Sequence, residues 1–277
     1  MFDTLHSPFS IDWAWRFTLS RVLAGGRSIA PRGKQILELD HHTLCVSMEY
    51  PVLICPERKI SYKFMAAEAL WILSGSNKLE DIAKYNQRMA EFSDDGCVLA
   101  GAYGPRIVSQ IAYVVGKLAE DTDTRQATLV IWQAAPAPSK DIPCTVAMDF
   151  KIREGKLNCH VFMRSSDIWL GVPYDVFSFS MVSLYVLWLY NRYQIASRAR
   201  GPIVSPGTLF LTAASSHLYQ QDVKAALEIR PFGESPIINY QLIPVELYDG
   251  TSRTALTERL LAIRDGDKNA RWWNDAS

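Results

Sequence analysis

The sequence predicts an α+β fold in which a central mixed or antiparallel sheet packs against helices. Helical and strand-like patterns both run through the chain, without the strict strand–helix alternation that a doubly wound parallel sheet requires. Two runs of alternating hydrophobicity, at 144–152 and 157–165, flank the short turn 153–156, and this pattern is the signal of an antiparallel hairpin. The hydrophobic content of 48% is enough to fill a core between the layers.

The N-terminal half supplies helices and the first strands. Trp15, Leu19 and Val22 recur at helical spacing and Gly25-Gly26 follows them, which indicates a helix and its end. The elements expected in this half are a helix at 11–25, strands at 34–40 and 42–50 separated at Asp40-His41, and helices at about 61–74, 79–92 and 106–119.

The C-terminal half supplies most of the sheet and the longest helix. Residues 178–190 are an apolar run of about 13 residues, shorter than the roughly 18 that a membrane span requires, and they indicate a buried core helix. The elements expected here are strands at 125–133, 144–152 and 157–165, a helix at 176–194, a strand at 208–214 and a short helix after Tyr219.

Charge and cysteine usage exclude several classes of protein. The 29 basic and 29 acidic residues cancel, so no overall charge attracts polyanions, and we expect neither nucleic acid nor a membrane as a partner. The five cysteines contain no CxxC pair, which argues against a disulfide framework or a zinc site, and no metal is expected. No signal-peptide pattern opens the chain, so we expect a cytoplasmic protein.

A few isolated side chains suggest chemistry. Cys144 begins an apolar strand after a Pro-rich loop, where it is either a nucleophile or an inert core thiol. Glu68 lies in an apolar stretch, where a charge is costly without a partner, unless it faces solvent from the helix surface. His217 and Tyr219 alternate with Leu218, so on an extended segment they share one face and suit either a sugar hydroxyl or a polar turn.

The segment 163–180 gathers polar residues between a strand and a helix. Arg164 and Ser165 follow the strand, where they suit either a phosphate site or a surface ion pair. Asp175 precedes the long helix, where Asp most often serves as an N-cap. None of these residues decides a function individually.

Six blocks, taken in order and spacing, resemble the thymidylate synthase family from about residue 20 to about residue 230. The resemblance implies a thymidylate synthase-like fold as one catalytic domain over 1–277. It also implies a homodimer that pairs through one face of the sheet, in a bacterial or phage-infected host cytoplasm. The blocks are EALWILSGSN, GAYG (101–104), DTR (123–125), PCT (143–145), RSSDIWLGVPYD and SSHLY.

The resemblance also implies roles at the reacting ring. Cys144 is expected to add to C6 of a pyrimidine nucleotide, Glu68 to organise water and protons near the ring, and Tyr103 to support the cysteine site. Asp175 stands where thymidylate synthases have the Asn that reads the base. Ser178, three residues later, matches the Ser usual in enzymes that act on deoxynucleotides.

Further matched residues are expected to hold the phosphate and the sugar. Arg27 is a rival to Arg32 in the N-terminal loop, and Gln126 replaces a second arginine of the family pattern. The residues implied are Arg164, Ser165, Arg32 and, from the second subunit, Arg125 for the 5′-phosphate, with His217 and Tyr219 for the sugar 3′-hydroxyl.

The cosubstrate implied by the family is 5,10-methylenetetrahydrofolate. Asp167 and Gly171 resemble the residues that contact its pterin, and Arg58 stands where the family places a basic residue near the folate tail. Met89 aligns with a Trp that shields the folate in synthases, and no synthase-type closing tail is visible in KNARWWNDAS. Both departures favour a site that admits water.

The departures favour hydroxymethylation of cytosine nucleotides. A carboxylate accepts a hydrogen bond from the 4-amino group of cytosine and, when protonated, donates one to N3, so Asp175 favours dCMP or CMP. Thr145, which follows the cysteine where synthases usually carry His, points the same way. In a hydroxymethylase water attacks the methylene left on C5, whereas in a synthase hydride from the folate reduces it to methyl.

Two alternative interpretations stay open at this point. The first is a methylase of the thymidylate synthase type, which acts on dCMP or dUMP and releases dihydrofolate. The second is a catalytically dead relative that binds a nucleotide or RNA, against which the joint retention of Cys144, Glu68 and Asp175 argues. The choice between ribose and deoxyribose depends on the shape of the pocket.

Overall fold

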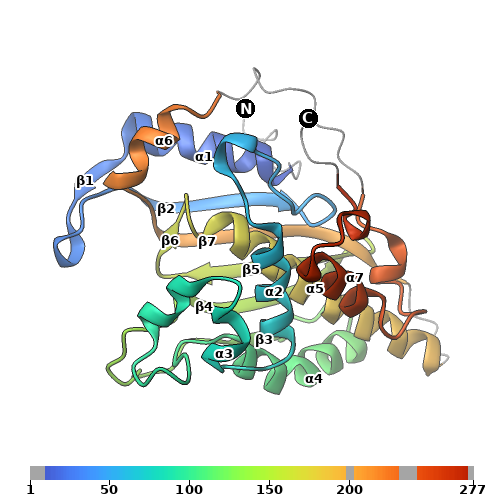
Figure 1. Cartoon of the computed structure of the whole chain (residues 1–277). Helices are drawn as coiled ribbons and strands as arrows, with labels where there is room; N and C mark the ends of the chain where they lie inside the picture. Colours follow the sequence, from blue (N-terminus) through green and yellow to red (C-terminus); the bar gives the residue numbers. More distant parts are fainter. Residues whose placement is uncertain (1–9, 198–202, 231–241, 274–277) are drawn as a thin grey trace.

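The computed structural model describes residues 10–197, 203–230 and 242–273. Its strands form one mixed sheet in the order β1-β2-β7-β5-β4-β3, with β6 paired to β7. The β5–β7 and β6–β7 pairs are parallel and the other pairs are antiparallel. The predicted α+β class with a mixed sheet is confirmed (Figure 1). The strands are β1 (Arg27–Ile29), β2 (Ile36–Ser47), β3 (Thr128–Val130), β4 (Thr145–Arg153), β5 (Lys156–Met163), β6 (Ser166–Asp167) and β7 (Ser205–Tyr219).

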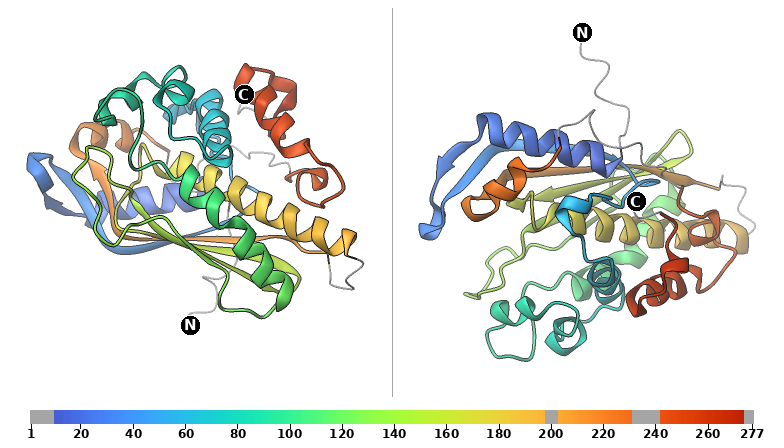
Figure 2. Two further views of the ribbon diagram at one scale, coloured as in Figure 1. Left: turned by 90° about the horizontal axis from the view of Figure 1, so that it is seen from below. Right: turned by 45° about the horizontal axis from the view of Figure 1, so that its top comes forward.

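Helices cover one face of this sheet (Figures 1 and 2). The central one, α5 (Val172–Ala196), is long and apolar enough to cross a membrane, but 72% of its apolar window is buried inside the molecule. It is therefore the buried core helix that the sequence predicts, and it packs against α2, α4 and the sheet. The other helices are α1 (Ile11–Gly25), α2 (Tyr62–Leu73), α3 (Leu79–Ala83), α4 (Gly104–Glu120), α6 (Val223–Leu227) and α7 (Ala255–Asp265).

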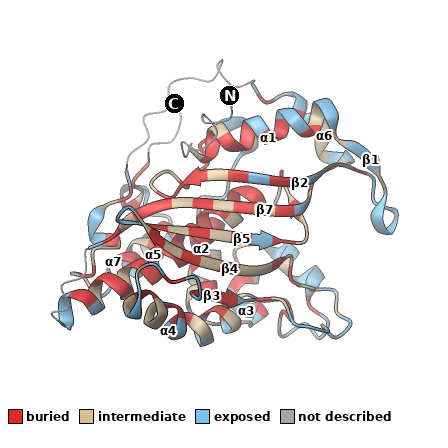
Figure 3. Cartoon of the chain, turned by 180° about the vertical axis from the view of Figure 1, so that it is seen from behind, coloured by how far each residue is buried: buried red, intermediate tan, exposed pale blue. Residues whose placement is uncertain are grey.

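The opposite face of the sheet carries no helix of the described chain (Figure 3). Side chains alternate between the two faces of a strand, so buried Val161 and Leu211 face the helices while their neighbours face away. On this second face Phe162 is 47% exposed, and the His160 ring stacks on Phe210 with centroids 4.5 Å apart. Exposed apolar and aromatic side chains of this kind mark a surface suited to association.

The break expected at Asp40-His41 is wrong. The two predicted strands are one strand, β2, which pairs along its length with β7. His41 adopts a φ of 50°, and the register with β7 passes from Asp40 directly to His42. The chain therefore makes a local kink at His41, and pairing on both sides of it keeps the strand continuous.

Other boundaries also differ from the prediction. The helix expected at 79–92 is α3 followed by a separate 3₁₀ helix, Gln87–Phe92. The strand expected at 125–133 is shorter in the structure, where it is β3. This strand lies at the edge of the sheet, with β4 as its neighbour. β7 continues past 214 to Tyr219, since β2 keeps pairing with it as far as Ile36. This extension places the SSHLY block in the sheet.

Candidate active site

A cavity of about 160 Å³ lies between α2, the start of α4, the loop before β4 and the first turns of α5. Residues that are distant in sequence meet on its wall. The predicted residues that line it are Glu68, Tyr103, Cys144, Asp175 and Ser178.

The loop that carries Cys144 is fixed by Arg164. The guanidinium donates from Nε to the carbonyl of Pro143 and from Nη2 to that of Ile142, both at 2.9 Å. The backbone N–H of Arg164 donates to the carbonyl of Cys144 at 2.9 Å. Burial raises the pKa of the Cys144 thiol, and the positive charge of Arg164 partly opposes this effect. Arg164 thus holds the thiol in place and favours its ionised form.

Glu68 and Asp175 are two carboxyls whose pKa values both rise in the same cavity. Burial raises the pKa of Glu68 to about 7, although Ser178 Oγ donates a hydrogen bond to Oε2 at 3.3 Å. Burial raises the pKa of Asp175 well above its ordinary value, and the negative charges of Glu68 and Asp167 add to the effect. Each carboxyl therefore keeps its proton to higher pH than usual, which suits groups that exchange protons with a substrate.

Asp175 is not the N-cap of α5. The cap position belongs to Gly171, and Asp175 lies within the first turn of the helix. A Cβ atom at position 171 would lie 3.1 Å from Asp175 Oδ2 and 3.0 Å from the carbonyl oxygen of Asp167. The glycine therefore lets the loop pass close to the Asp175 carboxyl. Its backbone carbonyl accepts the N–H of Asp175 at 2.9 Å.

Asp167 and Gly171, two of the residues expected at the folate, lie between the end of β6 and the start of α5, and Arg58 contacts this segment from the 3₁₀ helix Pro56–Arg58. Asp167 Oδ1 accepts the backbone N–H groups of Trp169 and Leu170, at 2.8 and 2.9 Å. Arg58 Nε donates to the carbonyl of Trp169 at 2.8 Å, and its guanidinium lies 5.0 Å from the centroid of the Trp169 ring. A carboxylate acceptor, an aromatic ring and a cation suit a pterin amine and an acidic tail, so the donor set fits a folate.

His217 and Tyr219 lie at the end of β7. Their rings meet edge to face with centroids 5.1 Å apart, as expected for residues on the same face of a strand. Ser165 Oγ lies 3.5 Å from His217 Nδ1, which brings the sugar-binding and phosphate-binding candidates together. Burial lowers the pKa of His217 while the Asp167 charge opposes this, so the neutral imidazole is favoured.

Of the two rival arginines of the N-terminal loop, Arg32 is the one whose charge reaches the cavity. It lies in the 3₁₀ helix Pro31–Gly33 with a φ of 52°, and its charge lowers the pKa of Cys144. Arg27 instead pairs with Glu38 on β2, with Nη2 and Oε2 3.2 Å apart. This arrangement favours Arg32 over Arg27 as the arginine of the N-terminal loop that acts on the thiol.

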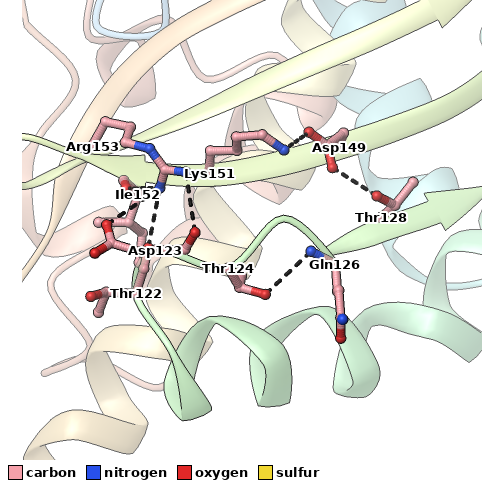
Figure 4. A network of polar contacts seen from close by, with 9 residues as sticks. All are labelled: Thr122, Asp123, Thr124, Gln126, Thr128, Asp149, Lys151, Ile152 and Arg153. Atoms are coloured by element: carbon pink, nitrogen blue, oxygen red, sulfur yellow. Dashed lines mark hydrogen bonds and ion pairs between the residues drawn. The ribbon is translucent and has the colours of Figure 1, made fainter.

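Arg125 is exposed and does not line the cavity within one chain. Its loop is anchored by Arg153, which donates to the carbonyl of Thr122 at 3.3 Å and forms an ion pair with Asp123 at 3.8 Å (Figure 4). The side chain of Gln126 points away from this network in the same view. The contribution of Arg125 from a second subunit stays a prediction.

Among the residues on the cavity wall that sequence reasoning missed are Asp141 and Trp71, whose side chains carry polar atoms. Trp71 lies three residues after Glu68 on α2, so helical periodicity alone places both on one face. Asp141 lies three residues before Cys144, in a loop where no periodicity predicts which side chains turn inward. Met89, singled out by its alignment, does line the cavity.

Comparison with known proteins relates the chain to one family. The sequence profile of the family described as Thymidylate synthase matches residues 15–241. A deoxyuridylate hydroxymethyltransferase of Bacillus phage SP01 is 34% identical over 175 residues, which cover 55% of this chain and 45% of the relative. Another from Pseudomonas phage M6 is 30% identical over 196 residues, which cover 67% of this chain and 52% of the relative.

The chain spans about half the length of these curated relatives. The family profile, by contrast, covers most of the chain and includes the segments that carry the cavity. Members of this family are folate-dependent one-carbon transferases that act on nucleotides. The sequence profile and the α+β architecture with its mixed sheet lead to the same conclusion: the chain belongs to the thymidylate synthase family.

Proposed function

We propose that the protein is a pyrimidine nucleotide 5-hydroxymethyltransferase that converts dCMP or CMP with 5,10-methylenetetrahydrofolate and water. The observation that carries the proposal is a single cavity in which the thiol of Cys144 lies with two proton-holding carboxyls, Glu68 and Asp175. The names of the phage relatives support the hydroxymethyl product.

The residues divide the chemistry between them. The thiolate of Cys144 adds to C6 of the ring and makes C5 nucleophilic, so that C5 takes the one-carbon unit that the folate supplies. Glu68, with a pKa of about 7, gives and takes protons near the ring at neutral pH. Asp175, held protonated by burial, donates to N3 of cytosine and accepts from its 4-amino group.

Water access separates the proposed reaction from methylation. Once the folate has left, an exocyclic methylene remains on C5, and the group that reaches it first determines the product. Met89 is smaller than the shielding Trp that it replaces and lines the cavity, which leaves room for water. Attack by water gives the 5-hydroxymethyl group.

The choice of base has a second candidate, dUMP. A protonated carboxyl donates once and accepts once, so it also pairs with uracil by donating to O4 and accepting from N3–H. The relatives named deoxyuridylate hydroxymethyltransferases favour this substrate. We favour cytosine because its N3 is a more basic acceptor than O4 of uracil, so a protonated Asp175 donates the stronger hydrogen bond to cytosine.

We assign the 5′-phosphate of the nucleotide to arginine side chains and its sugar to residues at the end of β7. Arg164 and Arg32 lie near the thiol and would hold the 5′-phosphate together with Arg125 of a second subunit. His217 and Tyr219 would bind the sugar. The uncovered face of the sheet supports a homodimer, because a large apolar surface is stabilised when a second copy covers it.

The test is to incubate the protein with methylenetetrahydrofolate and dCMP, CMP or dUMP in turn, and to determine product masses. The proposal expects a hydroxymethyl product from a cytosine nucleotide and no dihydrofolate, measured by absorbance. Cys144→Ser is the control and should abolish both product and tritium release from the 5-tritiated nucleotide. Production of dihydrofolate with a methyl product would instead establish the methylase.

A further inference from the structure

Asp141 places a third carboxyl group in the cavity, and the proposed function assigns it no role. It lies three residues before Cys144 and lines the same wall. Oδ2 accepts the backbone N–H of Gly101 at 2.6 Å, and Oδ1 makes no hydrogen bond within the described part of the chain. One oxygen is therefore anchored and the other is available.

The backbone of Gly101 lies very close to Asp141. A Cβ at position 101 would lie 2.8 Å from Asp141 Oδ1 and 2.5 Å from its backbone carbonyl oxygen, so only glycine fits there. On the other side of this segment, Arg106 of α4 donates to the carbonyls of Ala100 and Ala102, both at 2.9 Å. The carboxylate is thus held in one place by a segment that is itself clamped.

Asp141 differs from the other two carboxyls in its surroundings. Glu68 and Asp175 come from helices in the interior, and like-charge repulsion adds to the burial of Asp175. Asp141 lies on a loop and is half-buried. Burial raises the pKa of its carboxyl, while the Gly101 N–H and the cation of Arg106 oppose this rise and favour the ionised form. An ionised carboxylate near solvent can accept a proton from water, whereas a protonated one cannot.

We propose that Asp141 is the general base that deprotonates the water attacking the C5 methylene. This inference rests on the proposed hydroxymethyltransferase function. The free oxygen, Oδ1, takes a proton from water as the water oxygen forms a bond to the methylene carbon. The electrons of the exocyclic double bond move into the ring, towards C4. Cleavage of the C6–S bond then restores the C5–C6 double bond and releases the Cys144 thiolate.

Asp141→Asn is the decisive variant. The amide oxygen still accepts the Gly101 N–H, but the side chain no longer takes a proton. Asp94→Asn is the matched control, because Asp94 also anchors this loop, accepting from Ser139 Oγ at 2.6 Å and Lys140 N at 3.1 Å. Asp94 lies outside the cavity and its negative charge raises the pKa of Asp141, so Asp94→Asn changes the loop contacts while it leaves the ionised form of Asp141 favoured.

Two readouts divide the reaction at the step in question. Tritium release from the 5-tritiated nucleotide reports the steps up to formation of the methylene, and the hydroxymethyl product reports attack by water. A small thiol in the assay traps a methylene that water fails to reach, as a thioether on C5. All three quantities are measured for wild type, Asp141→Asn and Asp94→Asn.

We expect Asp141→Asn to keep tritium release within a factor of about three while hydroxymethyl product falls about 100-fold, in the range for loss of a general base. The thioether should replace the missing product, and Asp94→Asn should behave as wild type. Unchanged product in Asp141→Asn, or equal loss of tritium release and product, would overturn the inference. Absence of hydroxymethyl product from the wild type would overturn the proposed function itself.

Discussion

The raised pKa of Glu68 predicts a pH-dependent gain in stability when this residue becomes Gln. A carboxyl with a pKa of about 7 in the folded protein and an ordinary value of 4.5 binds its proton more tightly when folded. Stability is therefore lost as pH rises from 4.5 through 7, because the unfolded chain ionises first. Glu68→Gln has no proton to lose and escapes this cost.

The size of the effect follows from the two pKa values. At about 1.4 kcal/mol per pKa unit, the full cost approaches about 3 kcal/mol above pH 8 and is about 1 kcal/mol at pH 5. The variant should therefore gain about 2 kcal/mol over wild type between pH 5 and pH 8, or about 4 °C in Tm for a chain of this size. Loss of the Glu68 charge also relieves repulsion on Asp175, which acts in the same direction.

Urea unfolding followed by tryptophan fluorescence at pH 5 and pH 8 measures this gain. Protein concentration is held fixed, because association changes apparent stability. Glu91→Gln, at an exposed position, is the matched control and should give the same difference from wild type at both pH values. The Ser178 hydrogen bond survives in Glu68→Gln, since the amide oxygen still accepts it. A stability difference for Glu68→Gln that does not change with pH would refute the reasoning.

Three other predictions concern the site and its assembly. Asp175→Asn should move the kcat/KM ratio from cytosine towards uracil nucleotides by at least about tenfold. The amide donates to O4 of uracil and accepts from its N3–H, and cytosine has neither of these groups. An unchanged ratio would show that another residue reads the base. Arg164→Gln should shift the pH profile of Cys144 alkylation to higher pH, because a cation that lowers the thiol pKa is lost; an unshifted profile would contradict this. Mixing inactive Arg125→Gln and Cys144→Ser subunits should restore about a quarter of wild-type activity if Arg125 acts across a dimer, and none if it acts within its own chain.

Much of the fold could be predicted because it depends on local pattern. The helix at 11–25 matches α1, and the hairpin signal at 153–156 matches the β4–β5 turn, since periodicity and turn residues act over a few positions. The continuity of β2 through His41 and the length of β7 could not be predicted, because they depend on pairing between β2 and β7, which are far apart in sequence.

For the site, the sequence by itself predicted which residues carry chemistry. The blocks around Glu68, Cys144 and Asp175 identified the family, and the structure places these three side chains on one cavity wall. Only the tertiary structure decided their protonation, because burial and like-charge repulsion depend on neighbours from other elements. It also decided that Asp141 turns into the cavity, since a loop has no period that assigns a side chain to a face.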